Sequence, residues 1–132
     1  MRIKSSESLL LAIDLQGRLL PAIECAETVL ANVVWLVDVA QLIGVPVLAT
    51  EHCPQSLGLV EAGLRARFPL DTIVQKTHFS AVTEGELLQA HGAGRKQWVV
   101  VGTEAHVCVQ QTVLDLLAIG RQVYVVEDAV GS

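Results

Sequence analysis

The sequence predicts an α/β protein built on a doubly wound parallel sheet. Hydrophobic residues make up 52% of the 132 residues and aromatic residues only 4%, so the core must consist of Val, Leu, Ile and Ala. This aliphatic bias is typical of parallel strands that are buried on both faces. Short apolar runs also alternate with segments of helical periodicity, which is the order of elements in repeated βαβ units. At this length we expect a single domain over residues 1–132.

Strands and helices are expected from the apolar pattern and its breakers. The strands are expected over residues 8–13, 45–50, 71–75, 97–101 and 122–126, with a loop from residue 127 onward. The helices are expected over residues 26–43, 59–68, 83–91 and 106–119. Apolar residues at helical spacing indicate the first helix, where Trp35 falls on the apolar stripe. Thr83 and Glu86 form a capping-box pattern at the start of the third helix.

The charge and hydropathy patterns argue against two classes of protein. The formal net charge is −5, and Lys and Arg form none of the clusters that a nucleic-acid surface requires. No apolar run reaches the roughly 18–20 residues of a membrane span. Glu7 and Asp14 bracket the apolar run at residues 9–13, so this run is interpreted as a first strand and not as a signal peptide.

The cysteine pattern favours a reducing, cytoplasmic setting. Cys25, Cys53 and Cys108 are an odd number without CxxC spacing, which is neither a disulfide framework nor a structural zinc site. Cofactor motifs are also missing from the expected positions. Asp-Leu-Gln-Gly follows the first strand at residues 14–17, where a dinucleotide-binding protein would carry Gly-x-Gly-x-x-Gly, so no cofactor is expected.

Polar residues follow several of the expected strands. In a doubly wound sheet, ligands bind outside the carboxyl ends of the strands, so these side chains are expected to gather on one rim. The residues concerned are Asp14, Glu51, His52, Lys76, Thr103 and Glu104.

Cys108 is the candidate nucleophile because it lies just after the fourth strand, at the expected start of a helix. The positive end of the helix dipole and free N–H groups would lower the pKa of its thiol, and the same N–H groups would hold an oxyanion. A buried structural cysteine is the alternative interpretation. Asp14 and Lys76 each end a strand, so the three residues together supply a base, a cation and a nucleophile.

Four segments of the chain resemble the signatures of the isochorismatase-like cysteine hydrolase superfamily, which includes nicotinamidases and many amidases. These segments are residues 11–16, 76–81, 102–109 and 120–129. Residues 50–58 are similar to the corresponding stretch of the isochorismatase domain-containing proteins. The order and spacing agree over nearly the whole chain. The resemblance implies a three-layer α/β/α, Rossmann-like fold with the strand order 3-2-1-4-5.

Carried over by position, the resemblance implies Cys108 as the nucleophile, Asp14 as its base and Lys76 as the neighbour that tunes both. It further implies a cis peptide between Thr103 and Glu104, which would direct the N–H groups of Glu104 and Cys108 at the carbonyl oxygen of the substrate. The expected reaction is attack on a small amide or related acyl group, followed by hydrolysis of a thioester. The candidate pocket residues are Gln16, Glu51, His52, Phe79 and His106.

The chain departs from the family pattern in two places. Nicotinamidases carry an Asp and two His residues after the second strand to hold a metal, whereas Glu51, His52 and Cys53 stand here, so no metal is expected. Family members also continue beyond Ser132 with a helix and a sixth strand that cover one edge of the sheet. An uncovered edge favours association, so a homo-oligomer is expected. A catalytically inactive binding or scaffold protein is the alternative function.

Overall fold

The computed structural model describes residues 2–132 and contains a five-stranded sheet in the order β3-β2-β1-β4-β5. The strands are β1 (Ser8–Ile13), β2 (Val47–His52), β3 (Ile73–Lys76), β4 (Gln97–Thr103) and β5 (Gln122–Gly131). Every neighbouring pair of these strands is parallel. The predicted α/β class and strand order are therefore confirmed.

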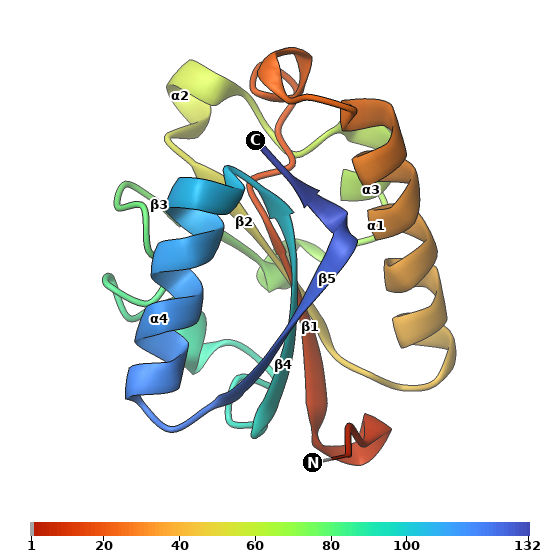
Figure 1. Ribbon diagram of the computed structural model, residues 1–132, viewed down its shortest axis with the longest axis vertical. Helices are drawn as coiled ribbons and strands as arrows, with labels where there is room; N and C mark the ends of the chain where they lie inside the picture. Colours follow the sequence, from red (N-terminus) through yellow and green to blue (C-terminus); the bar gives the residue numbers. More distant parts are fainter. Residues whose placement is uncertain (1) are drawn as a thin grey trace.

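Helices cover both faces of the sheet and give the fold three layers (Figure 1). The helix α1 (Ala26–Leu42) lies on one face and α4 (Gln110–Ala118) on the other. A single π-helical turn, η5 (Ala105–Val109), joins β4 to α4, and the short helices α2 (Pro54–Leu57) and α3 (Ala62–Arg65) follow β2. The remaining 3-10 turns are η1 (Ser5–Glu7), η2 (Leu20–Ala22), η3 (Leu70–Thr72) and η4 (Leu87–Gln89). Within residues 2–132, no helix combines the length and the apolar character needed to cross a membrane.

The side chains of β1 alternate across the sheet and divide the core into two halves. Leu10 and Ala12 pack on the side of α1, whereas Leu9, Leu11 and Ile13 pack on the side of α4. All six residues of β1 are buried, as expected for a parallel strand with helices on both faces. Since β2 and β4 also bind its two edges, β1 holds the residue that follows it in a well-defined place.

The helix expected over residues 83–91 is wrong. This segment forms turns and the short η4, and Gly85 within it adopts φ +81°. The carboxylate of Glu84 turns back to accept hydrogen bonds from the N–H groups of Thr77 and His78 at 2.8 and 3.2 Å. Glu84, which lies between the two residues of the predicted capping box, thus caps a loop after β3.

Two other elements differ in length from the expectation. The helix expected over residues 59–68 is reduced to the single turn α3, whose first N–H groups are capped by the Glu61 carboxylate. In contrast, β5 is longer than expected, and residues 127–131 are strand where a loop was predicted. A register shift between Val100 and Gly102 lets β5 continue its pairing with β4 to Gly131.

Trp35 is 64% exposed, so its predicted place in the core is wrong. The buried side of α1 carries Val29, Val33 and Val37 at intervals of four residues. Trp35 lies two residues from Val33, which is about half a turn around the helix and therefore on the side that faces solvent.

We predict that Gly102→Ala destabilises the protein through a backbone clash beside the end of β1. A Cβ atom at Gly102 would lie 2.1 Å from the carbonyl oxygen of Ile13, and the residue adopts φ +132°. Overpacking of this kind lowers the free energy of unfolding by about 1–3 kcal/mol, which urea denaturation would measure. Gly44→Ala is the matched control, because Gly44 has φ +79° with no atom within 4 Å of its Cβ position. An equal loss in both variants would contradict the clash.

Candidate active site

Asp14 is the first residue after β1, and its carboxylate is fully buried. It adopts φ +53°, a left-handed conformation that Asp tolerates better than most residues. Thr50, at the same level of the neighbouring strand β2, holds it in place. The Thr50 hydroxyl donates to Asp14 Oδ1 at 2.7 Å, and the Asp14 N–H donates to the Thr50 carbonyl oxygen at 3.2 Å.

Lys76 ends β3 and forms a buried ion pair with Asp14, with 3.0 Å between Nζ and Oδ2. Its ammonium group also donates to the carbonyl oxygens of His78 and Phe79 at 3.0 and 3.1 Å. A buried charge is tolerated only when it is paired and hydrogen-bonded in this way. The ammonium approaches Asp14 Oδ2 out of line for a hydrogen bond, so within residues 2–132 this oxygen has no hydrogen-bond donor. Its lone pairs are therefore free to accept a proton.

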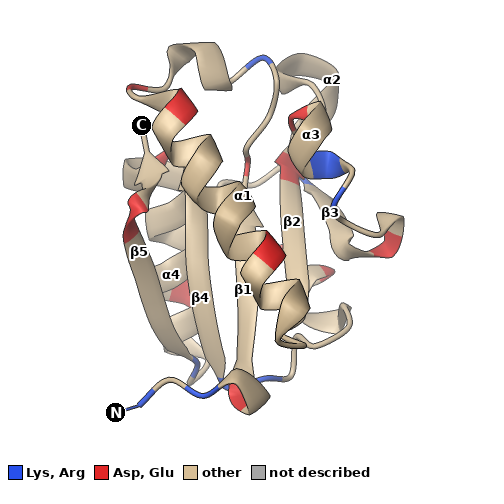
Figure 2. Cartoon of the chain, turned by 90° about the vertical axis from the view of Figure 1, so that its right-hand side faces the viewer, with Lys and Arg blue, Asp and Glu red and all other residues tan. Residues whose placement is uncertain are grey.

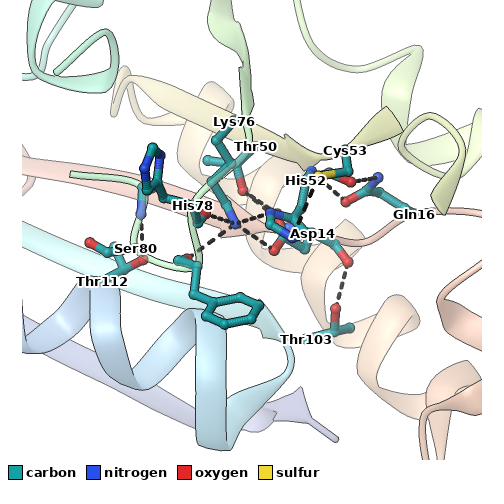
Figure 3. A network of polar contacts seen from close by, with 12 residues as sticks. Asp14, Gln16, Thr50, His52, Cys53, Lys76, His78, Ser80, Thr103 and Thr112 are labelled. Atoms are coloured by element: carbon teal, nitrogen blue, oxygen red, sulfur yellow. Dashed lines mark hydrogen bonds and ion pairs between the residues drawn. The ribbon is translucent and has the colours of Figure 1, made fainter. Parts of the chain in front are cut away.

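His52 completes the surroundings of Lys76, as Figure 3 shows. Lys76 Nζ lies 3.2 Å from His52 Nδ1, and because an ammonium group can only donate, Nδ1 must be the acceptor. The ring proton therefore sits on Nε2, which lies 3.8 Å from the sulfur of Cys53. Burial lowers the pKa of His52, and the positive charge of Lys76 lowers it further. His52 is thus a neutral acceptor at physiological pH.

Cys108 is buried in the π-helical turn η5, and it shares a pocket of about 300 Å³ with Asp14. His52, Phe79 and Glu104 also line this pocket. Its remaining wall is apolar and consists of Leu19, Leu57 and Val107. The nucleophile candidate and the base candidate therefore face one small cavity, with Lys76 behind the base.

The expected low pKa of the Cys108 thiol is wrong for the unliganded site. Burial raises the pKa of this thiol to about 12, the negative charge of Asp14 acts in the same direction, and Lys76 opposes both. Cys108 consequently rests as a neutral thiol in the unliganded site.

The turn after β4 differs from its predicted geometry. All peptide bonds described between residues 2 and 132 are trans, so the cis peptide expected between Thr103 and Glu104 is wrong. Gly102 at φ +132° and Glu104 at φ +59° make the turn instead, because positive φ values reverse the chain without a cis bond. Thr103 is fully buried, and its hydroxyl donates to the carbonyl oxygen of Asp14. Thr103 therefore helps to fix the backbone of Asp14.

Two of the five candidate pocket residues, His52 and Phe79, line the pocket, with their ring centroids 5.6 Å apart. Gln16 and Glu51 are fully buried and are not among the residues that line it. Gln16 grips the backbone of His52: its Nε2 donates to the His52 carbonyl oxygen at 3.0 Å, and its Oε1 accepts from the His52 N–H at 2.7 Å.

Glu51 and His106 have structural contacts instead of pocket contacts. Glu51 accepts hydrogen bonds from the Val60 N–H at 2.8 Å and from Arg65 Nε at 3.2 Å, which ties the loop after β2 to the sheet. His106 is exposed, and its Nδ1 lies 2.8 Å from the hydroxyl of Ser132. A polar residue at a strand end is therefore not sufficient evidence of a place in the pocket.

Sequence reasoning missed Thr50 and the apolar wall of the pocket. Thr50 could have been found, because it occupies the end of the strand that lies next to Asp14. Leu19, Leu57 and Val107 carry no comparable signal, since each is one aliphatic residue in a loop or turn. Among residues 2–132, no group of three or more His, Cys, Asp or Glu side chains is placed to hold a metal ion.

We predict that Asp14→Asn shifts the titration of Cys108 to lower pH, because it removes the negative charge that opposes thiolate formation. Lys76→Met should shift it to higher pH, because it removes the charge that favours thiolate. The pH dependence of iodoacetamide alkylation, resolved by site with mass spectrometry, would measure both shifts, with exposed Cys25 as the internal control. A wild-type Cys108 pKa at or below the value of about 8.5 for a free thiol would contradict the assignment.

Comparison with known proteins identifies the family. Residues 8–132 match the family model described as Isochorismatase domain. Isochorismatase domain-containing protein 1 of Salmo salar is 38% identical over an alignment of 125 positions, and the match covers 90% of this chain and 42% of that protein. This chain therefore spans less than half the length of that relative.

Two solved structures show the same relationship. MAR1 ribonuclease from Caenorhabditis elegans superposes with a TM-score of 0.88 at 35% identity, over 100% of this chain and 68% of that one. The YcaC gene product of Escherichia coli, described as an octameric hydrolase of unknown specificity, superposes with a TM-score of 0.92 at 26% identity, over 99% of this chain and 67% of that one. With the family model matched from β1 to the last residue, this chain belongs to the isochorismatase domain family.

Proposed function

We propose that this chain hydrolyses a small amide or related acyl substrate, with Cys108 as the nucleophile, Asp14 as the general base and Lys76 as the cation that holds the base. One observation carries this proposal. Asp14 Oδ2 is ion-paired but has no hydrogen-bond donor among residues 2–132, and Asp14 lines the pocket that also contains Cys108. A carboxylate with a free lone pair beside a thiol is the arrangement that general-base activation requires.

The proposed reaction begins with a neutral thiol. Because the pKa of Cys108 is raised to about 12, a stable thiolate does not form before substrate binds. The sulfur attacks the acyl carbon while its proton passes to Asp14 Oδ2. Asp14 then gives this proton to the departing amine, and the carbon–nitrogen bond breaks to leave an acyl thioester on Cys108. Water, deprotonated by Asp14, attacks the thioester and releases the acid and the free thiol.

Lys76 has an electrostatic role in this scheme. It remains within 3.0 Å of Asp14 Oδ2 while the carboxylate gains and loses the proton. Its other acceptors, the His78 and Phe79 carbonyl oxygens and neutral His52, fix the ammonium position during these changes. The backbone N–H groups of Glu104 and Cys108 are the proposed donors to the developing oxyanion, as Glu104 and Cys108 both line the pocket.

The other candidate roles receive less support. A catalytically inactive scaffold would not require a buried ion pair behind a thiol-lined cavity. Although one similar structure is a ribonuclease, a net charge of −5 without a basic cluster opposes binding of a phosphate backbone. The proposed chemistry needs a free thiol at Cys108. Cys25, Cys53 and Cys108 are all unpaired, which agrees with a cytoplasmic location.

We predict that Cys108→Ala, Asp14→Asn and Lys76→Ala each lower kcat/KM for a small primary amide by roughly 10²–10⁴. Release of ammonia would measure the rate, and intact mass spectrometry would detect the acyl group on Cys108. Cys25→Ala is the matched control, since Cys25 is exposed at the start of α1. Undiminished hydrolysis by Cys108→Ala would eliminate the proposed nucleophile.

We further propose that the chain forms a homo-oligomer, because within residues 2–132 β5 pairs only with β4, and Val125 of β5 is 48% exposed. The octameric E. coli hydrolase provides a precedent in a similar structure. Sedimentation equilibrium should give a mass that is a multiple of the chain mass. A monomer at micromolar concentration would contradict this expectation.

A further inference from the structure

The charges around the pocket point to the class of substrate that it accepts. Lys76, the cation closest to Cys108 in the proposed site, is only 1% exposed and is fully engaged by Asp14, His52 and two carbonyl oxygens. Asp14 and Lys76 therefore neutralise each other, and His52 is uncharged. Glu104 is left as the charged lining residue without an opposite charge, and its carboxylate has no hydrogen-bond or ion-pair partner within residues 2–132.

The other basic side chains of the described chain have contacts elsewhere. Arg18, next to the pocket residue Leu19, donates to the carbonyl oxygens of Gln55 and Ser56 at 3.2 and 3.4 Å and does not line the pocket. Arg65 pairs with Glu51, and Arg67 pairs with Asp38. Figure 2 shows a further group of Lys and Arg residues near the N-terminus, at the amino ends of the strands and away from the pocket.

The pocket is small, and the rest of its wall is apolar. Leu19, Leu57, Phe79 and Val107 surround a volume of about 300 Å³, which is at the lower end of the range for small-molecule sites. A substrate carboxylate in this space would lose its hydration, would find no Lys or Arg among the lining residues and would be repelled by Glu104. An uncharged alkyl group would fit the apolar wall, and a substrate ammonium group would gain Glu104 as its partner.

We propose that this pocket selects neutral or cationic small amides and rejects those that carry a carboxylate, with Glu104 as the residue that determines this selectivity. The inference rests on the proposed hydrolase function and adds the charge class of its substrate.

Three primary amides of similar length test the proposal: butanamide, 4-aminobutanamide and succinamate, which are neutral, cationic and anionic. Ammonia release by the full chain should give a kcat/KM for the first two at least about tenfold above that for succinamate. In Glu104→Gln, which keeps the side-chain shape, the ratio of cationic to anionic substrate should fall at least about fivefold. Glu127→Gln is the matched control, because it removes the same charge from an exposed position of β5 outside the pocket lining, and its ratio should equal that of the wild type.

A second readout does not depend on hydrolysis. Aminoethyl and sulfonatoethyl methanethiosulfonate are cationic and anionic thiol probes, and each forms a disulfide with Cys108 as methanesulfinate leaves. The cationic-to-anionic ratio of Cys108 modification rates, resolved by mass spectrometry, should fall in Glu104→Gln and stay constant in Glu127→Gln. Modification of exposed Cys25 verifies that both probes are active.

The two readouts distinguish failure of this inference from failure of the proposed function. If no amide is hydrolysed but the probe ratio depends on Glu104, the charge selectivity holds and the amide hydrolysis does not. If amides are hydrolysed and succinamate reacts as fast as butanamide, the selectivity is overturned and the hydrolase function holds. An equal response of Glu104→Gln and Glu127→Gln in both assays would also overturn the selectivity.

Discussion

The buried ion pair between Asp14 and Lys76 is the constraint on which the site depends. Neither charge reaches solvent, so each must be satisfied by the protein, and loss of one partner of such a pair typically costs about 3–5 kcal/mol. The strand order β3-β2-β1 explains how this is achieved. Lys76 and Asp14 end the two outer strands of this trio, and β2 between them supplies Thr50 to the carboxylate and His52 to the ammonium. Three strand ends thus form one polar unit.

This unit determines the state of the thiol beside it. A carboxylate that keeps its charge opposes a second negative charge in the same cavity, so Cys108 rests in its protonated form. The thiol is the less reactive form toward oxidants and alkylating agents, since the thiolate is the nucleophile. In the proposed reaction, this arrangement couples the reactivity of Cys108 to the presence of a substrate. The thiol proton would pass to Asp14 only as the bond from sulfur to the acyl carbon forms.

In the proposed function, the catalytic groups and the groups that select the substrate come from different parts of the fold. The groups around the base are held at the carboxyl ends of parallel strands, where backbone pairing leaves little freedom. The pocket wall comes from the segments that follow those strands, namely Leu19 after β1, Leu57 in α2, Phe79 after β3 and Val107 in η5. Loop segments of this kind can change their side chains without disturbing the ion pair. The charge of the pocket wall can therefore change while the ion pair between Asp14 and Lys76 stays the same.

The sequence by itself determined the α/β class, the alternation of strands and helices and the strand ends that carry Asp14, Lys76 and the turn before Cys108, because apolar periodicity reports burial directly. Resemblance supplied the strand order. Only the tertiary structure decided which polar strand-end residues enter the pocket. The side chains of Gln16 and Glu51 form hydrogen bonds with backbone N–H groups, whereas His52, adjacent to Glu51 in sequence, faces Lys76. The pKa of the Cys108 thiol was likewise decided by the tertiary structure. Proximity to a helix start is visible in the sequence, whereas burial and the negative charge of Asp14, which both raise this pKa, are not.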